Sequence, residues 1–362
     1  MASRSASIRR AQVPMPCGFC NGNKIQWKCE ECDIFMCNTC KDKIHGRIKS
    51  TKDHEVISFK NIKEDSFSST EVSSDVISSI FNSYITTIPV SNLQCSDDDI
   101  LYIIASKDQE KLIKGKMLKA SIRTMMSLDE AIFDIAVNKQ GELLFTQLSR
   151  VPESPLRLLL MSGEIRTLIN PNPMRLLALH LNKDNELVCG LREQGPPFPI
   201  HDFSVRQVVI FGSDYKRKMT FEFDGKGNRL FSHPARIRTD SKNVTYIVDW
   251  IASNLSGRIV ALDRSGRLKF SYCGPTYFNF FKPSSIVVTP SDNIVLSDQH
   301  NDALLALNSR GNLLAIQFVH ELNITTPCAL CIDSEGFLLI GCYQDEGQSG
   351  KIHAVKLTET LM

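Results

Sequence analysis

Short apolar runs recur along most of this chain, and each one follows a polar turn and precedes a small or polar residue. The six stretches of this kind are Ser96–Ala105, Asn138–Gln147, Asn182–Leu191, Asp240–Asp249, Pro290–Asp298 and Asp333–Cys342. Their last residues lie 42, 44, 58, 49 and 44 positions apart. A period of about 40–50 residues with turn signals every 8–12 is typical of strands stacked in repeated blades.

The strands within one repeat are clearest late in the chain. Apolar, β-branched segments predict four short strands at Pro283–Thr289, Asn293–Ser297, Ala303–Asn308 and Leu313–Val319. A hairpin turn between the last two is supplied by Asn308-Ser-Arg-Gly311, and the preceding repeat has Asp263-Arg-Ser-Gly266 at the equivalent place. Four strands per unit and six units predict an all-β fold, a six-bladed β-propeller.

The two ends of the repeat region complete each other. The last repeat finishes with Lys351–Leu357 and is one strand short of a blade. A β-prone run around residues 77–88 precedes the first repeat and has no other partner. We therefore predict that this run is the outer strand of the last blade, because closing the ring removes an exposed sheet edge.

The chain before the repeats has a different composition. Residues 59–76 include the serine-rich run Ser66–Asp75 and lack heptad spacing, which predicts a flexible linker. We expect residues 1–12 to be a disordered arm, 13–58 to be a small separate domain and 77–362 to be the propeller.

The small domain is dense in cysteine. Three Cys-x2-Cys pairs followed by two histidines lie between Cys17 and His54, and they hold six of the 12 cysteines. The N-terminus has no apolar run of signal-peptide length, and no stretch approaches ~18 apolar residues, so we expect neither secretion nor a membrane span. Reduced thiols in the cytoplasm or the nucleus favour zinc over a disulfide scaffold.

The order of the pairs predicts two zinc sites. Two residues between paired cysteines let one knuckle present both sulfurs to one ion, and zinc takes four such ligands in a tetrahedron. With alternate pairs sharing a metal, one ion takes Cys17, Cys20, Cys37 and Cys40, and the other takes Cys29, Cys32, His45 and His54. Protein ligands fill both sites, so we predict two structural Zn2+ ions whose binding folds a domain too small for a sufficient core.

These motifs resemble known families. The ligand spacing, ending in Asp53-His-Glu-Val-Ile57, resembles a B-box zinc finger and is closer to type 1 than to type 2. The repeats resemble the NHL-repeat propeller, most clearly over residues 230–357, where a blade reads roughly Pro…Ile-x-Val-Asp-x-x-Gly-x-Ile-x-Val-x-Asp. A B-box followed by NHL repeats is similar to the tripartite-motif (TRIM) family, which implies a place in ubiquitin pathways.

The TRIM resemblance also implies a RING finger before the B-box and a coiled coil after it. No cysteine precedes Cys17, and only the serine-rich linker occupies the coiled-coil position. We therefore expect this chain to lack both elements and not to be a ubiquitin ligase itself. It would instead self-associate or pair with a RING-bearing relative.

One face of the propeller offers candidate binding residues, because the turn after the second strand of each blade lies on that face, around the channel. The repeat register places there Arg192, Asp249, Trp250, Asp298, His300 and Tyr343. Aromatic residues and arginine are enriched at binding hot spots, so we predict a partner-binding rim. In the alternative, Asp249 and Asp298 only cap tight turns and Trp250 covers a blade edge.

Two further features have open interpretations. The insertion Glu193–Asp202, with three prolines, is either an exposed recognition loop or a tolerated insertion. Cys328 and Cys331 lie three apart on one predicted strand and so point to opposite faces. That spacing indicates buried thiols rather than a metal site.

Charge and motifs narrow the function classes. The chain carries 42 basic and 40 acidic side chains, so it is not a strongly basic nucleic-acid binder. A six-bladed propeller hydrolase would need carboxylates and asparagines that converge on a calcium ion in the channel, and the predicted rim has only Asp249 and Asp298, in adjacent blades. No nucleophile elbow or Gly-rich phosphate loop is present.

We predict a non-enzymatic zinc-binding interaction protein whose B-box and propeller bind partner proteins. The alternative is an RNA-binding regulator that gathers Lys107, Arg192, Arg236 and Arg238 on the channel face. A propeller hydrolase is the less favoured reading of the same face.

Overall fold

The computed structural model describes residues 17, 19–20, 26–29, 34–47, 54, 56–58, 72–96, 99–105, 110–147, 154–343 and 349–362. The chain divides into two compact units, Met1–Glu71 and Val72–Met362. The predicted arm, residues 1–12, and most of the predicted linker lie outside the described residues. No helix in the described ranges is long and apolar enough to cross a bilayer.

The first unit is a small sheet with one short helix. Its strands β1 (Trp27–Cys29), β2 (Ile34–Met36) and β3 (Val56–Ser58) form an antiparallel sheet in the order β2-β1-β3. The helix α1 (Asn38–Lys43) follows β2 directly, and the 3-10 turn η1 (His45–Arg47) follows α1. Lys41 Nζ lies 3.6 Å from the ring centroid of Trp27, and the Trp27 indole donates to Asn38 Oδ1 at 3.0 Å, so α1 packs on β1.

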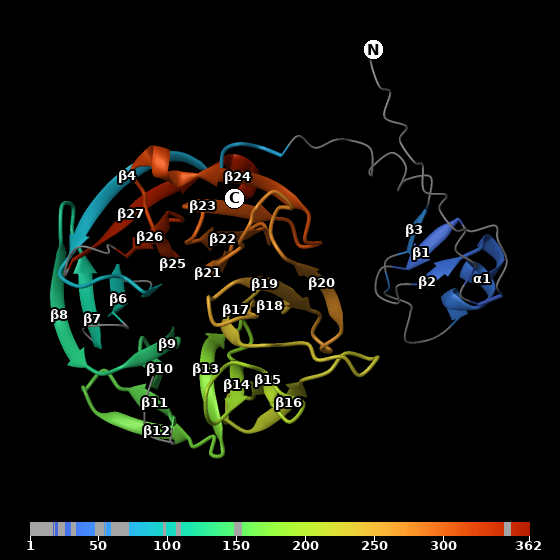
Figure 1. Cartoon of the computed structure of the whole chain (residues 1–362), viewed down its shortest axis with the longest axis horizontal. Helices are drawn as coiled ribbons and strands as arrows, with labels where there is room; N and C mark the ends of the chain where they lie inside the picture. The colour runs from blue at the N-terminus through green and yellow to red at the C-terminus, as the bar shows by residue number, and fades with distance from the viewer. Residues whose placement is uncertain are drawn as a thin grey trace, which may run out of the picture. The chain divides into compact units, whose positions relative to one another are not determined.

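The second unit is a six-bladed β-propeller, as predicted, with six four-stranded antiparallel sheets (Figure 1). Blade 1 contains β5 (Asn92–Cys95), β6 (Ile100–Ala105), β7 (Lys111–Met117) and β8 (Ile122–Asp129). Blade 2 contains β9 (Ile132–Val137), β10 (Leu143–Gln147), β11 (Leu156–Leu159) and β12 (Ile165–Ile169). Blade 3 contains β13 (Met174–Leu181), β14 (Leu187–Glu193), β15 (Arg206–Phe211) and β16 (Arg217–Phe221).

The remaining blades follow the same plan. Blade 4 contains β17 (Pro234–Thr239), β18 (Thr245–Trp250), β19 (Gly257–Leu262) and β20 (Leu268–Tyr272). Blade 5 contains β21 (Pro283–Val288), β22 (Ile294–Asp298), β23 (Ala303–Leu307) and β24 (Leu313–Phe318), followed by the 3-10 turn η3 (Val319–Leu322). Blade 6 contains β25 (Pro327–Ile332), β26 (Leu338–Cys342) and β27 (Gly350–Leu357), and the chain ends after the 3-10 turn η4 (Glu359–Leu361).

The ring closes through the strand that precedes blade 1. The strand β4 (Ile77–Thr86) pairs antiparallel with β27 and is the fourth, outer strand of blade 6. The predicted closure is therefore confirmed. The predicted linker ends earlier than expected, because Ser73 bridges Ala315 and Val76 is fully buried in the core of blades 5 and 6. Apolar burial and backbone pairing thus hold residues 72–76 on the propeller.

The polar turns of repeats two to six are capped by side chains. In blade 4, Asp240 Oδ1 accepts the backbone N–H groups of Lys242 and Val244, both at 2.8 Å. In the hairpin of blade 5, Asn308 Oδ1 accepts those of Arg310 and Asn312, and Gly311 there has a φ of 85°. Asp and Asn side chains form such turns, and glycine adopts positive φ without strain, so the periodic sequence signal has a local cause.

The core lies between neighbouring blades. Six apolar clusters fill the spaces between consecutive blades, including the space between blades 6 and 1. The first strands contact one another in the order β5, β9, β13, β17, β21, β25 and back to β5, and so form the innermost layer of the ring. The ends of these strands and of the second strands therefore surround one channel opening.

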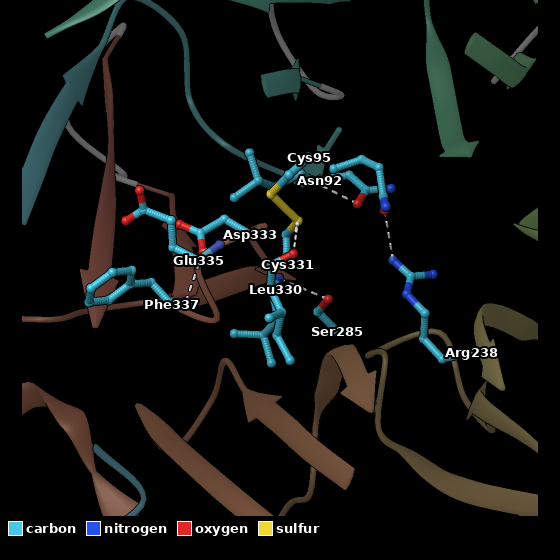
Figure 2. Close-up of a disulfide and its surroundings, with 12 residues drawn as sticks. Asn92, Cys95, Arg238, Ser285, Leu330, Cys331, Asp333, Glu335 and Phe337 are labelled. Carbon is cyan, nitrogen blue, oxygen red and sulfur yellow. Dashed lines mark hydrogen bonds between the residues drawn. A yellow bond between two sulfur atoms is a disulfide. The ribbon is translucent and has the colours of Figure 1, made fainter. Parts of the chain in front are cut away.

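A disulfide joins the first strands of blades 1 and 6. The Cys95 and Cys331 sulfurs are bonded, with their Cα atoms 6.4 Å apart (Figure 2). The expectation that the thiols are all reduced is wrong for this pair, because ring closure places β25 beside β5 although the two residues are 236 apart in sequence. Cys328 is buried, as expected, and its thiol donates to Thr326 O at 3.1 Å.

Candidate functional site

Four cysteine sulfurs gather beside α1. The sulfurs of Cys17, Cys20, Cys37 and Cys40 all lie within 4.8 Å of one another. Cys37 occupies the N-cap of α1 and Cys40 lies within the helix. The Cys20 and Cys37 sulfurs are 3.8 Å apart. Two sulfurs bound to one tetrahedral zinc at about 2.3 Å would be about 3.8 Å apart, so this group has the spacing that zinc requires.

A second group combines sulfur and imidazole. The ligand atoms of Cys29, His45 and His54 lie within 4.8 Å of one another, and Cys29 Sγ is 3.6 Å from His54 Nδ1. About 3.6 Å is also the separation of one sulfur and one nitrogen on a tetrahedral zinc. Cys32, the predicted fourth ligand of this group, lies outside the described residues. The two groups follow the alternate pairing expected from the ligand order.

The ligands are also the interior of the first unit. Its buried described side chains are Cys17, Cys29, Met36, Cys40 and His45, and all but Met36 are ligands. Burial disfavours the Cys17 thiolate, but backbone hydrogen bonds, including one from Cys37 N at 3.4 Å, lower the pKa of Cys17 to about 6. The thiolate is the form that binds zinc. Because the described residues of this unit bury little apolar side chain besides Met36, we expect its fold to depend on the metal.

On the propeller, two of the predicted rim residues are buried turn caps. Asp249 Oδ1 accepts the backbone N–H groups of Ser232 and His233 at 2.8 and 2.7 Å, and burial raises the pKa of Asp249. Asp298 Oδ1 likewise accepts the N–H of His300 at 3.0 Å. Both carboxylates are fully buried. They therefore have the capping role of the structural alternative and do not form a rim.

The carboxylates needed for a calcium site do not converge in the described part of the propeller. Within the described residues, groups of at least three closely spaced His, Cys, Asp or Glu ligands occur only in the two zinc clusters. His300 packs against Phe280 on blade 5, with ring centroids 5.7 Å apart, and Tyr343 follows β26 on blade 6. These two predicted rim residues lie apart from Arg192 and Trp250.

Arg192 and Trp250 do come together, at a pocket of about 570 Å³. It is formed where blades 2, 3 and 4 meet at the channel opening. The lining residues are Phe133, Gln147, Arg175, Leu176, Leu177, Arg192, Pro197, Phe198, His233, Trp250, Ser253 and Leu255. This volume is within the usual range for ligand pockets, about 300–1,000 Å³, and the wall is largely apolar with few polar groups, as in most binding sites.

Aromatic rings shape the pocket around His233. The His233 ring stacks on Trp250, with centroids 5.5 Å apart and an interplanar angle of 6°, and lies 5.9 Å from Phe198. Phe133 meets the edge of Trp250 at 6.3 Å. Burial, and then the charges of Arg192, Arg206 and Arg236, lower the pKa of His233 to about 3. His233 is therefore neutral at neutral pH.

The insertion of the third repeat supplies one wall. Pro197 and Phe198 line the pocket, and two buried arginines hold their loop by its carbonyls. Arg206 Nη2 donates to Pro197 O at 2.8 Å, and Arg192 Nη1 donates to Gly195 O at 2.7 Å. The insertion is thus a fixed part of the pocket.

Sequence reasoning missed Phe133, Phe198 and His233. The predicted rim included only residues at or after the ends of second strands, such as Trp250 at the end of β18. The first and second strands of a blade are antiparallel, so the first strand starts at the edge where the second strand ends. In blade 4, for example, Pro234 at the start of β17 pairs with Asp249 near the end of β18. The signal that could have found Phe133 and His233 is their position at the start of β9 and just before β17.

The arginines of the RNA-binding alternative do not form a set of exposed cations on the channel face. Arg192 and Arg236 are buried, and Arg238 Nη1 donates to Ile237 O at 2.7 Å. Lys107, the fourth residue of that prediction, lies outside the described residues.

Comparison with known families concerns the first unit. Residues 17–56 match the family described as the ANCHR-like B-box zinc-binding domain. These residues form a B-box zinc-binding domain. The predicted resemblance is therefore confirmed, and the two ligand clusters of the B-box are consistent with zinc. A B-box and a six-bladed propeller in one chain fit a TRIM-like organisation.

Solved structures resemble the propeller. Virginiamycin B lyase from Staphylococcus aureus is 12% identical with a TM-score of 0.51, covering 78% of this chain and 98% of its own. A calcium-binding regucalcin from Agrobacterium tumefaciens is 12% identical with a TM-score of 0.53, covering 75% and 92%. The PQQ-bound aldose sugar dehydrogenase from Streptomyces coelicolor is 10% identical with a TM-score of 0.56, covering 77% and 98%. At these identities the likeness shows the fold only. No curated protein matches the chain.

Proposed function

We propose that this chain is a non-enzymatic interaction protein whose zinc-binding B-box and propeller each bind partner proteins. The observation that carries the proposal is the pocket at blades 2, 3 and 4. Arginine and tryptophan, the residue types enriched at binding hot spots, meet there in Arg192 and Trp250. The B-box contributes a second surface on a separate compact unit.

Two observations favour binding over catalysis. The neutral His233 has its ring stacked on Trp250, and the nearest predicted carboxylate, Asp249, is buried in an ion pair with Arg258. Among its described lining residues, the pocket has no carboxylate, cysteine or tyrosine that would act as nucleophile or base. RNA binding remains the alternative, but Arg192 and Arg236 are recessed and are not arranged to follow a phosphate backbone.

The finer part of the proposal follows from the TRIM resemblance. We propose that the chain acts in ubiquitin pathways in the cytoplasm or the nucleus. It would do so by self-associating or by pairing with a RING-bearing relative. The propeller would then select the partner protein, and its blades would correspond to NHL repeats.

Affinity capture with the zinc-loaded full chain tests the proposal. We expect distinct sets of proteins to be lost on Cys37→Ser, which removes a zinc ligand of the B-box, and on Trp250→Ala, which removes a pocket wall. Cys273→Ser is the matched control, because Cys273 is an exposed free thiol outside both sites. Capture of the same proteins by all four chains would contradict the proposal, and so would capture that ribonuclease abolishes.

A further inference from the structure

The floor of the propeller pocket holds a buried, incompletely bonded cation. The Arg192 side chain lines the pocket, yet the residue is only 5% exposed. Its Nη1 donates to the carbonyls of Glu193 and Gly195, while its Nε has no hydrogen-bond partner within the described part of the chain. A buried donor without an acceptor is unfavourable, so such a group favours a ligand that supplies the acceptor.

The charges around Arg192 are positive. Arg175 also lines the pocket, and Arg206 and Arg236 lie behind the wall, close enough that their charges act on Arg192 or His233. The carboxylate whose charge acts on Arg192, that of Glu193, is already paired with Arg206 at 2.8 Å. Burial, and then the charges of Arg175 and Arg206, lower the pKa of Arg192 to about 10, so it stays charged at neutral pH. The lining residues that the structure describes include no acidic side chain, which favours an anion in the pocket.

The remaining wall is apolar. Leu176, Leu177 and Leu255 contribute aliphatic surface, and Phe198 and Trp250 contribute aromatic surface. An anion that binds here must therefore carry an apolar group beside its charge, because burial against these side chains is favourable only for apolar surface. A phosphate alone would leave most of the wall uncovered.

The geometry favours a peptide over a nucleic acid. Single-stranded nucleic acids need exposed rings for stacking and a surface row of cations. One face of Trp250 is already covered by His233, and the Trp250 indole donates to Pro283 O at 3.0 Å. Arg175 and Arg192 are paired residues of β13 and β14, and Arg192 is buried, so these two cations do not form a surface row.

We propose that this pocket binds an acidic peptide segment of a partner protein, with an Asp or Glu carboxylate at Arg192 and a neighbouring large apolar side chain against Phe198 and Trp250. This inference rests on the proposed function, to which it adds the chemistry of the partner. It makes the pocket a site for a short linear segment.

An exposed residue at the pocket gives a test that does not threaten the fold. Ser253 lines the pocket and is exposed. Ser253→Glu adds a negative charge to the wall, and Ser253→Gln is its neutral match. Ser213→Glu is the control for charge elsewhere, because Ser213 is exposed and follows β15 at the blade edge opposite Arg192.

The probe is a phage-displayed library of short random peptides, selected on the zinc-loaded full chain. We expect enriched peptides to contain Asp or Glu next to Phe, Leu, Trp or Met. Synthetic copies should bind Ser253→Glu about 5-fold or more weakly than Ser253→Gln, and Ser213→Glu should bind like the unchanged chain. Replacing the acidic residue of the peptide by its amide should weaken binding by a similar factor.

Other results would overturn the inference. These are enrichment of basic or uncharged peptides, no enrichment at all, and equal binding by Ser253→Glu and Ser253→Gln. If partner proteins captured by the full chain are lost on Cys37→Ser or Trp250→Ala but retained by Ser253→Glu, the proposed function stands and this inference fails. If none of these variants changes what is captured, both fail.

Discussion

The Arg258 guanidinium and the Asp249 carboxylate form an ion pair, with Nε and Oδ2 3.0 Å apart. Asp249 directly precedes Trp250 in the chain. Asp249 is fully buried, whereas the Arg258 side chain is 27% exposed. The same carboxylate accepts the N–H groups of Ser232 and His233. One side chain thus fixes the segment that leads into β17 and the end of β18, and with it two residues of the pocket.

Asp249→Ala should therefore destabilise the propeller strongly. Removing one partner of a buried pair leaves uncompensated polar groups, and such changes decrease the free energy of unfolding by about 3–5 kcal/mol. The urea midpoint of the propeller transition measures the change. Glu164→Ala removes an exposed ion pair with Arg166 and should shift the midpoint very little. Equal shifts in the two variants would show that Asp249 has no special structural role.

Zinc removal should unfold the B-box and leave the propeller intact. The chain has two tryptophans, and Trp27 lies in the B-box while Trp250 lies in blade 4. With Trp250→Phe, a chelator should shift the fluorescence of Trp27 to longer wavelength as β1 becomes exposed. With Trp27→Phe, the fluorescence of Trp250 and the far-UV β signal should not change. A shift of Trp250 fluorescence on chelation would argue against two independent units.

Ring closure by β4 can be tested by shortening the chain. A chain that starts at Val72 keeps β4 and the Gln317 side chain contact to Val76 N, so it should remain a folded monomer. A chain that starts at Ser91 lacks β4, exposes the edge of β27 and should self-associate or unfold. Size-exclusion chromatography and far-UV circular dichroism distinguish the two. A monomeric, folded chain from Ser91 would mean that β4 is dispensable.

His233 should make the propeller sensitive to acid. Burial and the neighbouring arginines lower its pKa to about 3, whereas the unfolded chain has about 6.5, so protonation favours unfolding. The contribution of the neutral ring to stability is complete above pH about 6.5 and is lost as the pH falls toward 3, about 2 kcal/mol of it between pH 7 and pH 5. Urea midpoints at these two pH values should differ less in His233→Phe, which retains a ring against Trp250.

The control for this effect is His201→Phe, because His201 is exposed. It should keep the acid sensitivity of the unchanged chain. If His233→Phe and His201→Phe lose the same stability between pH 7 and pH 5, protonation of His233 does not oppose folding.

The Cys95–Cys331 disulfide should stabilise the propeller only when it is oxidised. Cys95→Ser removes a link between two strands 236 residues apart and should decrease the free energy of unfolding by about 2–5 kcal/mol without reductant. With dithiothreitol, Cys95→Ser and the unchanged chain should have similar urea midpoints. Cys273→Ser, at an exposed free thiol, should have the urea midpoint of the unchanged chain with and without dithiothreitol. A shift that persists unchanged in dithiothreitol would mean that packing, and not the bond, is responsible.

Features with local causes were predictable from the sequence. The turns at Asp263–Gly266 and Asn308–Gly311 depend on their own side chains and on glycine at positive φ, so their spacing indicated the blades. Counting strands then predicted the pairing of β4 with β27. The zinc ligands were readable for a similar reason, since two residues between cysteines already suit one ion.

The functional meaning of the rim residues was not predictable in this way. Asp249 and Asp298 recur because each caps a turn, so their repetition indicated a structural role and not a site. The pocket joins Phe133 of blade 2, Phe198 of the insertion and Trp250 of blade 4. No periodicity relates these three positions.

The sequence by itself thus determined the blades, their number, the closing strand and the seven described ligands of the B-box, because neighbouring residues and fixed spacings encode them. Only the tertiary structure decided that Arg192 is buried beside Trp250 and that Cys95 meets Cys331. Both depend on how six blades close into one ring, which brings distant segments to the same channel opening or the same seam. That is a property of the whole propeller and of no single stretch of the chain.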